Sequence, residues 1–500
     1  MDLNCDFDNN YRGLKDGDSP EEACGVFGIR VTPHTRSVSH ATYDGLYALQ
    51  HRGQESAGMA VSDGKSITVY KNMGLVSNVF DDRTLLSLPG YLAVGHTRYS
   101  TTGSSTWGNA QPVFRAVGDS GIALGHNGNL TNTLALADEL GISFVDLRSD
   151  SDLVAHFLAT EIARGLGSKP GAVTESVKCR PDALLDALNV VLPRLNGAFS
   201  LVIMDHDRLI GVRDPNGFRP LCLGQLEQGY VIASESPALD VVGATFIREI
   251  DPGEMVVIDS TGVRSITPFP AETIDPKLCI FEFVYFARPD AQLLGREVYT
   301  TRRKMGEYLA KSLPVDADIV MGVPESGVAA AVGYAAMSGI PFGQGLVKNR
   351  YIGRTFISPD PASRVDAVRR KLNVLRDNIT GQRVIVVDDS IVRGTTTKAM
   401  VKLLREAGAT EVHLRISSPP YKWSCFYGID TPSRPDLLAA TRSMDEIREF
   451  LEVDSIAYLD LEDLKAAIGF KDNGYCAACL TGEYPVEVPI YMHTKPAVGL

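Results

Sequence analysis

The chain has 500 residues, a hydrophobic content of 44% and a formal net charge of -12, so it is long enough for two domains with full cores. Its longest apolar stretch, around Val328–Met337, is far shorter than the ~20 residues of a membrane span, and no transmembrane helix is expected. The acidic balance argues against general nucleic-acid binding, which normally uses a basic face or domain.

The first 23 residues are predicted to be a removable leader. They carry seven acidic residues against Arg12 and Lys15, with no apolar core segment, and so match neither a secretory nor a mitochondrial signal. Eight cysteines in a large chain of this kind indicate a reducing compartment, where thiols serve as nucleophiles or metal ligands. We therefore expect a cytoplasmic protein.

From Cys24 to about Asp259 the pattern predicts many short strands interrupted by two helical stretches, Ala41–Gln50 and Ser151–Arg164. This combination indicates sheets covered by helices. A turn-rich passage, Ser260–Pro270, is the predicted linker. The clearest strands are Leu92–Gly95, Ile122–Gly125, Leu201–Met204 and Tyr230–Ala233.

Beyond the linker, strands and helices alternate, which predicts a parallel sheet. The elements are a strand at Asp318–Val323, a helix from Gly327, a strand near Gly345, a helix from Arg364 and a strand at Val384–Val387.

The run Val384–Lys398 is the most informative part of the chain. Its β-branched residues predict a buried strand, and the apolar stripe that follows predicts a helix ending at Gly408. Backbone N–H groups of Gly394–Thr397 at this turn can bind phosphate oxygens. Asp388 and Asp389 repel phosphate, so they suit ribose hydroxyls or a Mg²⁺ ion carried with a polyphosphate. A solvated Asp-Asp turn is the alternative for the bare pair.

Basic residues ahead of this turn provide local positive charge for an anionic substrate in an acidic chain. For the second group, a solvated helix face explains the charges equally well. The two groups are Lys348, Arg350 and Arg354, then Arg369, Arg370 and Lys371.

Six motifs together resemble one enzyme family, the glutamine phosphoribosylpyrophosphate (PRPP) amidotransferases. The first three resemble its glutaminase half, and the last resembles the PRPP signature of type I phosphoribosyltransferases. Each motif alone is moderately specific, but their order along the chain is very specific. They are Cys24–Gly28, Gly95–Ser100, Gly125–Leu130, Tyr285–Asp290, Lys348–Tyr351 and Val384–Lys398.

The resemblance implies a mixed α+β and α/β fold class. An N-terminal-nucleophile hydrolase sandwich, layered αββα, would be followed by a type I phosphoribosyltransferase domain with a parallel sheet. The implied ranges are a propeptide at 1–23, a class II glutamine amidotransferase domain at 24–259, and a phosphoribosyltransferase domain at 260–500 with a C-terminal cluster-binding segment.

A thiol that hydrolyses an amide needs a base, and the nucleophile's own α-amine, with a pKa near 7.7–8, can serve. Cys24 is internal as encoded, so we expect cleavage after Ala23 to expose that amine. The resemblance makes Cys24 the nucleophile, although a buried strand cysteine is the common alternative.

The family pattern also assigns the residues around the substrate amide. Asn127 and Gly128 would form the oxyanion hole. Arg98 would bind the carboxylate of glutamine, and Asp150 would bind its ammonium group. His126 resembles a base in isolation, but the family pattern makes it structural.

At the other site, the resemblance implies that ammonia attacks C1 of PRPP while pyrophosphate leaves. Ser326, Asp388 and Asp389 would hold Mg²⁺, and Lys348 and Arg350 would belong to a mobile loop over PRPP. Tyr285 would couple the two sites. The full PRPP-binding set is Asp388, Asp389, Arg393, Gly394, Thr395, Thr396, Thr397, Lys348 and Arg350.

Four cysteines resemble the ligands of the iron–sulfur subclass of the family, which binds a [4Fe–4S] cluster. They are Cys279, Cys425, Cys476 and Cys479. A four-cysteine zinc site is the chemical rival, since thiolates alone do not discriminate the two metals. Cys5, Cys179 and Cys222 are interpreted as a leader residue and two core thiols.

Family analogy implies an enzyme that makes 5-phosphoribosylamine from PRPP, glutamine and water, as the first committed step of purine synthesis. It adds feedback by purine nucleotides and a homotetramer, with neither nucleic acid nor membrane as a partner. A PRPP- or nucleotide-sensing regulator is the alternative from another class, but it would not need a glutaminase constellation. A stand-alone glutaminase or sugar amidotransferase would leave the Asp388–Thr397 turn unexplained.

Overall fold

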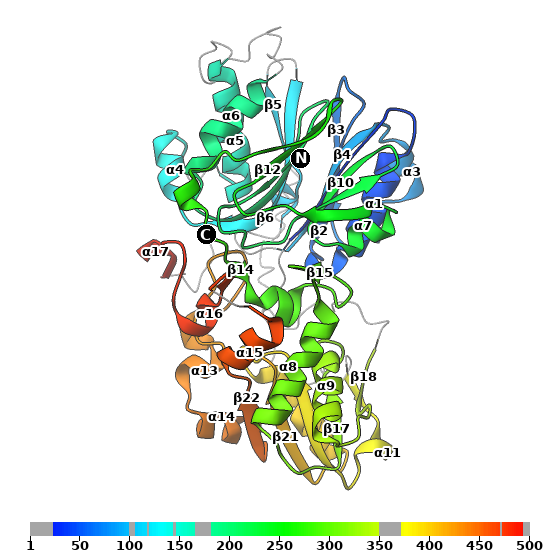
Figure 1. The fold of residues 1–500 in the computed structure, drawn as a ribbon, viewed down its shortest axis with the longest axis vertical. Helices are drawn as coiled ribbons and strands as arrows, with labels where there is room; N and C mark the ends of the chain where they lie inside the picture. The colour runs from blue at the N-terminus through cyan, green and yellow to red at the C-terminus, as the bar shows by residue number, and fades with distance from the viewer. Residues whose placement is uncertain are drawn as a thin grey trace, which may run out of the picture. The chain divides into compact units, whose positions relative to one another are not determined.

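A computed structural model describes residues 24–99, 106–117, 120–143, 147–165, 182–349, 372–470 and 473–493. The described chain divides into two compact units (Figure 1). The first unit comprises residues 24–301, 423–434 and 468–493, and the second comprises residues 302–422 and 435–467. None of the described helices is long and apolar enough to cross a membrane.

The first unit contains two antiparallel sheets. One has the strand order β11-β9-β10-β1-β4-β2-β3 and the other β13-β12-β8-β7-β6-β5. The strands of the first sheet are β1 Gly25–Val31, β2 Ser56–Ser62, β3 Ile67–Met73, β4 Leu92–Arg98, β9 Cys222–Leu226, β10 Gly229–Ala233 and β11 Thr245–Glu249. Those of the second are β5 Val113–Val117, β6 Ser120–Leu130, β7 Gly197–Met204, β8 Leu209–Arg213, β12 Met255–Asp259 and β13 Gly262–Ile266.

The first unit has four layers, with helices on both outer sides and the two sheets between them. Because successive residues of a strand point to opposite faces, each sheet packs against the other sheet on one face and against helices on the other. In β1, Val26 packs between the two sheets, whereas Phe27 packs under the helices that cover the outer face. In β7, Val202 faces the other sheet and Ile203 packs under the opposite helices. Figure 1 shows these helices on the two outer sides. They are α1 Val38–Ala48 and α7 Pro237–Val241 on one side, and α5 Asp150–Gly165 and α6 Ala183–Val191 on the other.

The second unit is built on a four-stranded parallel sheet in the order β17-β20-β21-β22. Helices connect its strands, as expected for parallel neighbours. The strands are β17 Ile319–Gly322, β20 Arg383–Asp388, β21 Glu411–Ile416 and β22 Ser455–Tyr458, and the principal helices are α8 Val298–Ser312, α9 Val328–Ser338, α12 Thr395–Glu406 and α14 Met444–Leu451.

Most predicted elements are confirmed, but the predicted linker Ser260–Pro270 is wrong. Gly262–Ile266 pairs along its full length with β12 as the edge strand β13. The turn residues that suggested a linker form a tight hairpin instead, in which Asp259 Oδ1 accepts hydrogen bonds from the Thr261 N–H and hydroxyl. The leader 1–23 and the helix predicted from Arg364 lie outside the described residues.

Candidate active sites

Cys24 lies just before β1 and is 7% exposed. The pairing of β1 with β4 places Gly25 opposite Thr97, so the thiol lies beside the end of β4 and donates to the Tyr99 carbonyl oxygen at 3.4 Å. Burial raises the pKa of Cys24 to about 12, although the charge of Arg98 opposes this shift. A thiol in this environment is protonated near pH 7 and needs a local base to become a nucleophile.

Asn127 and Gly128 lie on β6, which crosses β1 and β4 across the space between the sheets. A β-carbon at Gly125 would contact Val26 of β1 at 3.5 Å. Asn127 is fully buried, and neither polar atom of its side chain has a hydrogen-bond partner among the described residues. A buried, unpaired amide costs free energy, which a ligand can recover. Its Nδ2 group thus has the property expected of an oxyanion donor.

Only glycine fits at position 128. Its φ is +151°, and a β-carbon there would overlap the Ala198 carbonyl oxygen of β7. On its other side, the backbone of Gly128 approaches Gly428 so closely that a β-carbon on Gly428 would lie 3.0 Å from the Gly128 α-carbon. These close approaches explain why the predicted donor pair contains a glycine.

Arg98 and Asp150 bring charge to the same region. The Arg98 side chain is 4% exposed and lies 3.6 Å from Glu55. Asp150 begins α5, and its carboxylate accepts the N–H groups of Leu130 and Ser151 at 3.2 and 2.7 Å. Burial alone would raise the pKa of Asp150, but the charge of His126 and these hydrogen bonds lower it overall. Asp150 is therefore an ionised carboxylate.

His126 is held on every side, in agreement with a structural role. Its backbone N–H donates to Gln111 at 2.8 Å, and its Nδ1 lies 3.1 Å from the Ser151 hydroxyl. Its Nε2 lies 3.4 Å from the Ala198 carbonyl oxygen, and its own carbonyl oxygen is 3.0 Å from His96 Nε2.

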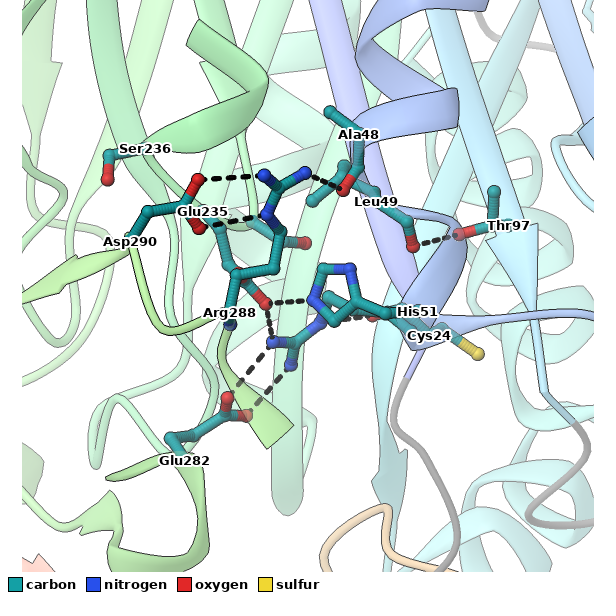
Figure 2. Close-up of polar contacts among 12 residues, drawn as sticks. Cys24, Ala48, Leu49, His51, Thr97, Glu235, Ser236, Glu282, Arg288 and Asp290 are labelled. Carbon is teal, nitrogen blue, oxygen red and sulfur yellow. Dashed lines mark hydrogen bonds and ion pairs between the residues drawn. The ribbon is translucent and has the colours of Figure 1, made fainter. Parts of the chain in front are cut away.

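Sequence reasoning missed Arg52, which anchors the main chain of the predicted nucleophile. Arg52 Nε donates to the Cys24 carbonyl oxygen at 3.2 Å, and the guanidinium is held between Glu235 and Glu282. Figure 2 shows the two glutamates, with His51 also reaching Glu235 at 2.8 Å. Burial opposes charge on Arg52, but the two carboxylates raise its pKa above the ordinary value.

The four cysteines predicted to hold a cluster all lie buried in the first unit. Cys279 on β14 (Leu278–Cys279) and Cys476 on β23 (Tyr475–Cys476) are direct partners in a parallel pair. The Tyr427 N–H donates to the Cys425 sulfur at 3.3 Å. Burial raises the pKa of Cys279 to about 12. Within the described ranges, no three His, Cys, Asp or Glu residues form a group that could hold a single metal ion.

In the second unit, β20 ends at the buried acidic pair. Asp388 Oδ1 accepts the Ser326 hydroxyl at 3.2 Å and the Asp389 N–H at 2.9 Å. Asp389 is fully buried, and its Oδ1 has no hydrogen-bond partner in the described part of the chain. Burial raises the pKa of both carboxyl groups; the charge of Asp389 adds to the effect on Asp388, and the cation Arg302 opposes the effect on Asp389. The pair therefore favours a cation or hydroxyl donors nearby.

The predicted phosphate turn joins β20 to α12. Gly394 caps α12 with a φ of +77°, where a β-carbon would lie 2.8 Å from Leu438. Thr395, Thr396 and Thr397 form the first turn of α12, and Thr397 is buried whereas Thr395 is exposed. The facing turn also needs glycine, because a β-carbon at Gly327 would overlap the Val387 carbonyl oxygen.

The remaining predicted site residues are placed as follows. Lys348 is exposed at the end of β18 (Leu346–Lys348), Arg393 is partly exposed in the phosphate turn, and Arg350 lies outside the described residues. Tyr285 lies in a π-helical turn, Glu282–Phe286, of the first unit and packs edge-on against Phe286. Cys222 is a core thiol as predicted, whereas Cys5 and Cys179 lie outside the described residues.

Comparisons with known proteins identify the domain families of both halves of the chain. Residues 96–241 match a glutamine amidotransferase domain family, and residues 300–417 match a phosphoribosyl transferase domain family. The chain is 50% identical over 488 residues to an amidophosphoribosyltransferase of Mycobacterium tuberculosis, covering 95% of this chain and 88% of that relative. It is 43% identical over 487 residues to that of Bacillus subtilis, covering 95% and 98%. This chain belongs to the amidophosphoribosyltransferase family.

Solved structures of amidophosphoribosyltransferases confirm the predicted fold class. The B. subtilis glutamine PRPP amidotransferase complexed with ADP and GMP matches with a TM-score of 0.83 and 42% identity, covering 94% of this chain and 100% of that chain. A structure described as the allosteric regulatory enzyme of purine biosynthesis matches with a TM-score of 0.84 and 43% identity, covering 95% and 99%. Membership in this enzyme family favours the enzyme over the sensing regulator.

The acidic pair is expected to lower the stability of the protein as pH rises, the opposite of what an ion-paired aspartate does. Folding raises the pKa of Asp388 above its ordinary value of 3.8. The pair therefore does not lower the free energy of unfolding below pH 3.8, but lowers it as pH rises through the raised pKa. Asp388→Asn keeps an acceptor for Ser326 but removes one charge. In metal-free buffer we expect it to raise the melting temperature at pH 8 by about 2–4 °C, and not at pH 3.5.

Asp318→Asn is the matched control with the opposite sign. Asp318 binds Arg383 at 2.8 Å, which lowers the pKa of Asp318 to about 2. Its contribution is present above the ordinary pKa of 3.8 and lost as pH falls through 2, so the substitution should not stabilise the protein at pH 8. Equal melting temperatures for wild type and Asp388→Asn at both pH values would show that the pair carries no repulsion.

Proposed function

We propose that this amidophosphoribosyltransferase makes 5-phosphoribosylamine from PRPP, glutamine and water, with glutamate and pyrophosphate as co-products, at the first committed step of purine synthesis. The observation that carries the proposal is that one chain combines a buried thiol and an unpaired buried amide, both in the first unit, with a glycine-capped turn that follows two buried aspartates in the second unit. The first arrangement suits amide hydrolysis, and the second suits a phosphorylated sugar.

In the nitrogen-releasing half, removal of residues 1–23 would give Cys24 a free α-amine, the base that its protonated thiol needs. The thiolate then attacks the side-chain amide of glutamine, ammonia leaves, and a thioester forms that water hydrolyses to glutamate. Asn127 Nδ2 and the Gly128 N–H would stabilise the oxyanion. The buried cation Arg98 and the ionised Asp150 have the charges needed for the carboxylate and ammonium groups of glutamine.

In the phosphoribosyl half, the turn from Arg393 to Thr397 would bind the 5-phosphate at the N-terminus of α12. Ser326, Asp388 and Asp389 would face the ribose and hold Mg²⁺, which neutralises charge on the leaving pyrophosphate when bound. The unpaired Asp389 Oδ1 and the raised pKa of both carboxyl groups fit this role. Few protein ligands suffice, because Mg²⁺ commonly takes its other ligands from substrate phosphates and water.

Lys348 and Arg350 would close over PRPP and exclude water, which keeps ammonia from becoming unreactive ammonium. Tyr285 would couple PRPP binding to glutaminase activity. Cytoplasmic location, feedback by purine nucleotides and a homotetramer remain part of the proposal. The structure of the B. subtilis enzyme complexed with ADP and GMP supports the nucleotide part.

The four buried thiols Cys279, Cys425, Cys476 and Cys479 would hold a [4Fe–4S] cluster with a structural or oxygen-sensing role. Their burial and the N–H donor to the Cys425 sulfur suit an iron–sulfur site. Anaerobically purified protein is expected to be brown and to contain about four irons per chain. A colourless protein that contains zinc would contradict the cluster, and Cys222→Ser is the control that should leave iron content unchanged.

Cys24→Ala separates the two halves of the reaction. We expect it to lose at least about 10³-fold in pyrophosphate release with glutamine, because the covalent step is gone, while release with ammonia stays near the wild-type rate. The intact mass of active wild-type enzyme should correspond to a chain that begins at Cys24. Retention of residues 1–23 in fully glutamine-active enzyme would refute the leader; failure of wild type to release pyrophosphate with either donor would refute the transferase.

A further inference from the structure

Glu282 is the centre of a buried charge chain that begins at the nucleophile. Its Oε1 and Oε2 atoms accept from Arg52 Nη2 and Nη1 at 2.8 and 3.0 Å, and its Oε1 also accepts from Arg219 Nη1 at 3.2 Å. Glu282 and Arg219 are fully buried, and Arg52 is 1% exposed. All three residues belong to the first unit.

Arg52 links Glu282 to Cys24, because its guanidinium hydrogen-bonds both the Glu282 carboxylate and the Cys24 carbonyl oxygen. The guanidinium is planar and presents its donors in a rigid fork. Its two Nη atoms are bound by Glu282, Glu235 takes a second donor of Nη1, and Nε is thereby aimed at the Cys24 carbonyl oxygen. Through these hydrogen bonds, we expect a shift of the Glu282 carboxylate to rotate the guanidinium and to displace the main chain of Cys24.

Glu282 also belongs to the segment that carries the other proposed functions of this unit. It lies three residues after Cys279 and three before Tyr285, and it opens the π-helical turn that contains Tyr285. Arg219 continues the chain to the loop of Cys425, since Nε and Nη2 both donate to the Tyr427 carbonyl oxygen at 3.2 and 2.8 Å. The Glu282 carboxylate thus lies in the Cys279 segment and is connected through Arg219 to the Cys425 loop.

We propose that Glu282 is a positioning residue for glutamine hydrolysis, which holds Cys24 in its reactive geometry through Arg52 and ties that geometry to the segments around Tyr285 and Cys425. The inference rests on the proposed role of Cys24 as nucleophile. Simple neutralisation of buried arginines is the competing explanation, because two arginines face two glutamates here. If Glu282 only neutralised the arginines, a shorter carboxylate side chain at this position would change the stability of the fold and not the reactivity of the Cys24 thiol.

Glu282→Asp tests the proposal because it keeps the charge and shortens the reach by one methylene group. We expect the kcat for glutamine hydrolysis to fall about 10-fold to 100-fold, since a displacement near 1 Å can cost this much. The KM for glutamine should change less than about threefold, because Arg98 and Asp150 are untouched. Alkylation of Cys24 by an electrophilic diazoketone analogue of glutamine should slow in parallel, and pyrophosphate release with ammonia should remain.

Glu254→Asp is the matched control. Glu254 is also buried and binds Arg248 through both carboxylate oxygens at 2.6 and 2.7 Å, but neither residue contacts Cys24. Wild-type kcat and alkylation rate in Glu282→Asp, or an equal loss in Glu254→Asp, would overturn the proposal. Glutamine use that survives Cys24→Ala would instead overturn the nucleophile itself, so the two failures are distinguishable.

Discussion

The glutaminase half of this protein depends on a cation buried in its core. Arg52 has almost no exposure to water, and two fully buried carboxylates hold it against the Cys24 carbonyl oxygen. A buried charge is tolerable only when it is paired and hydrogen-bonded. The network therefore cannot relax without leaving charge uncompensated, which holds Cys24 and the adjoining start of β1 in place.

The second unit uses buried charge in the opposite way. Asp388 and Asp389 are adjacent like charges in a region sheltered from water, and burial shifts both toward the protonated form. This arrangement costs folding free energy without a ligand and gains from a ligand that brings a cation or hydroxyl donors. The charges around Cys24 are thus paired within the protein, whereas the pKa values of the acidic pair are raised and Asp389 Oδ1 has no hydrogen-bond partner among the described residues.

Features formed by contiguous residues could be predicted from the sequence, whereas contacts between residues far apart in the chain could not. The strand, acidic pair, glycine and helix of the predicted phosphate turn could be located because they are contiguous in the sequence, and the parallel sheet follows from the alternation of strands with helices. Arg52 could not be recognised, because its partners Glu235 and Glu282 lie 183 and 230 residues away. The proposed oxyanion donors Asn127 and Gly128 were reached only through family resemblance, since an unpaired buried amide is a property of packing. The linker prediction was wrong because turn residues occur in hairpins and in linkers alike.

One chain of this family releases nitrogen from glutamine and delivers it to a phosphoribosyl group. Glutamate and pyrophosphate should be measured in the same reaction, with glutamine as the sole nitrogen donor and PRPP present or absent. We expect equal amounts of both products when PRPP is present and much slower glutamate formation when it is absent. Glutamate formed at the same rate without PRPP, or without matching pyrophosphate, would contradict this expectation.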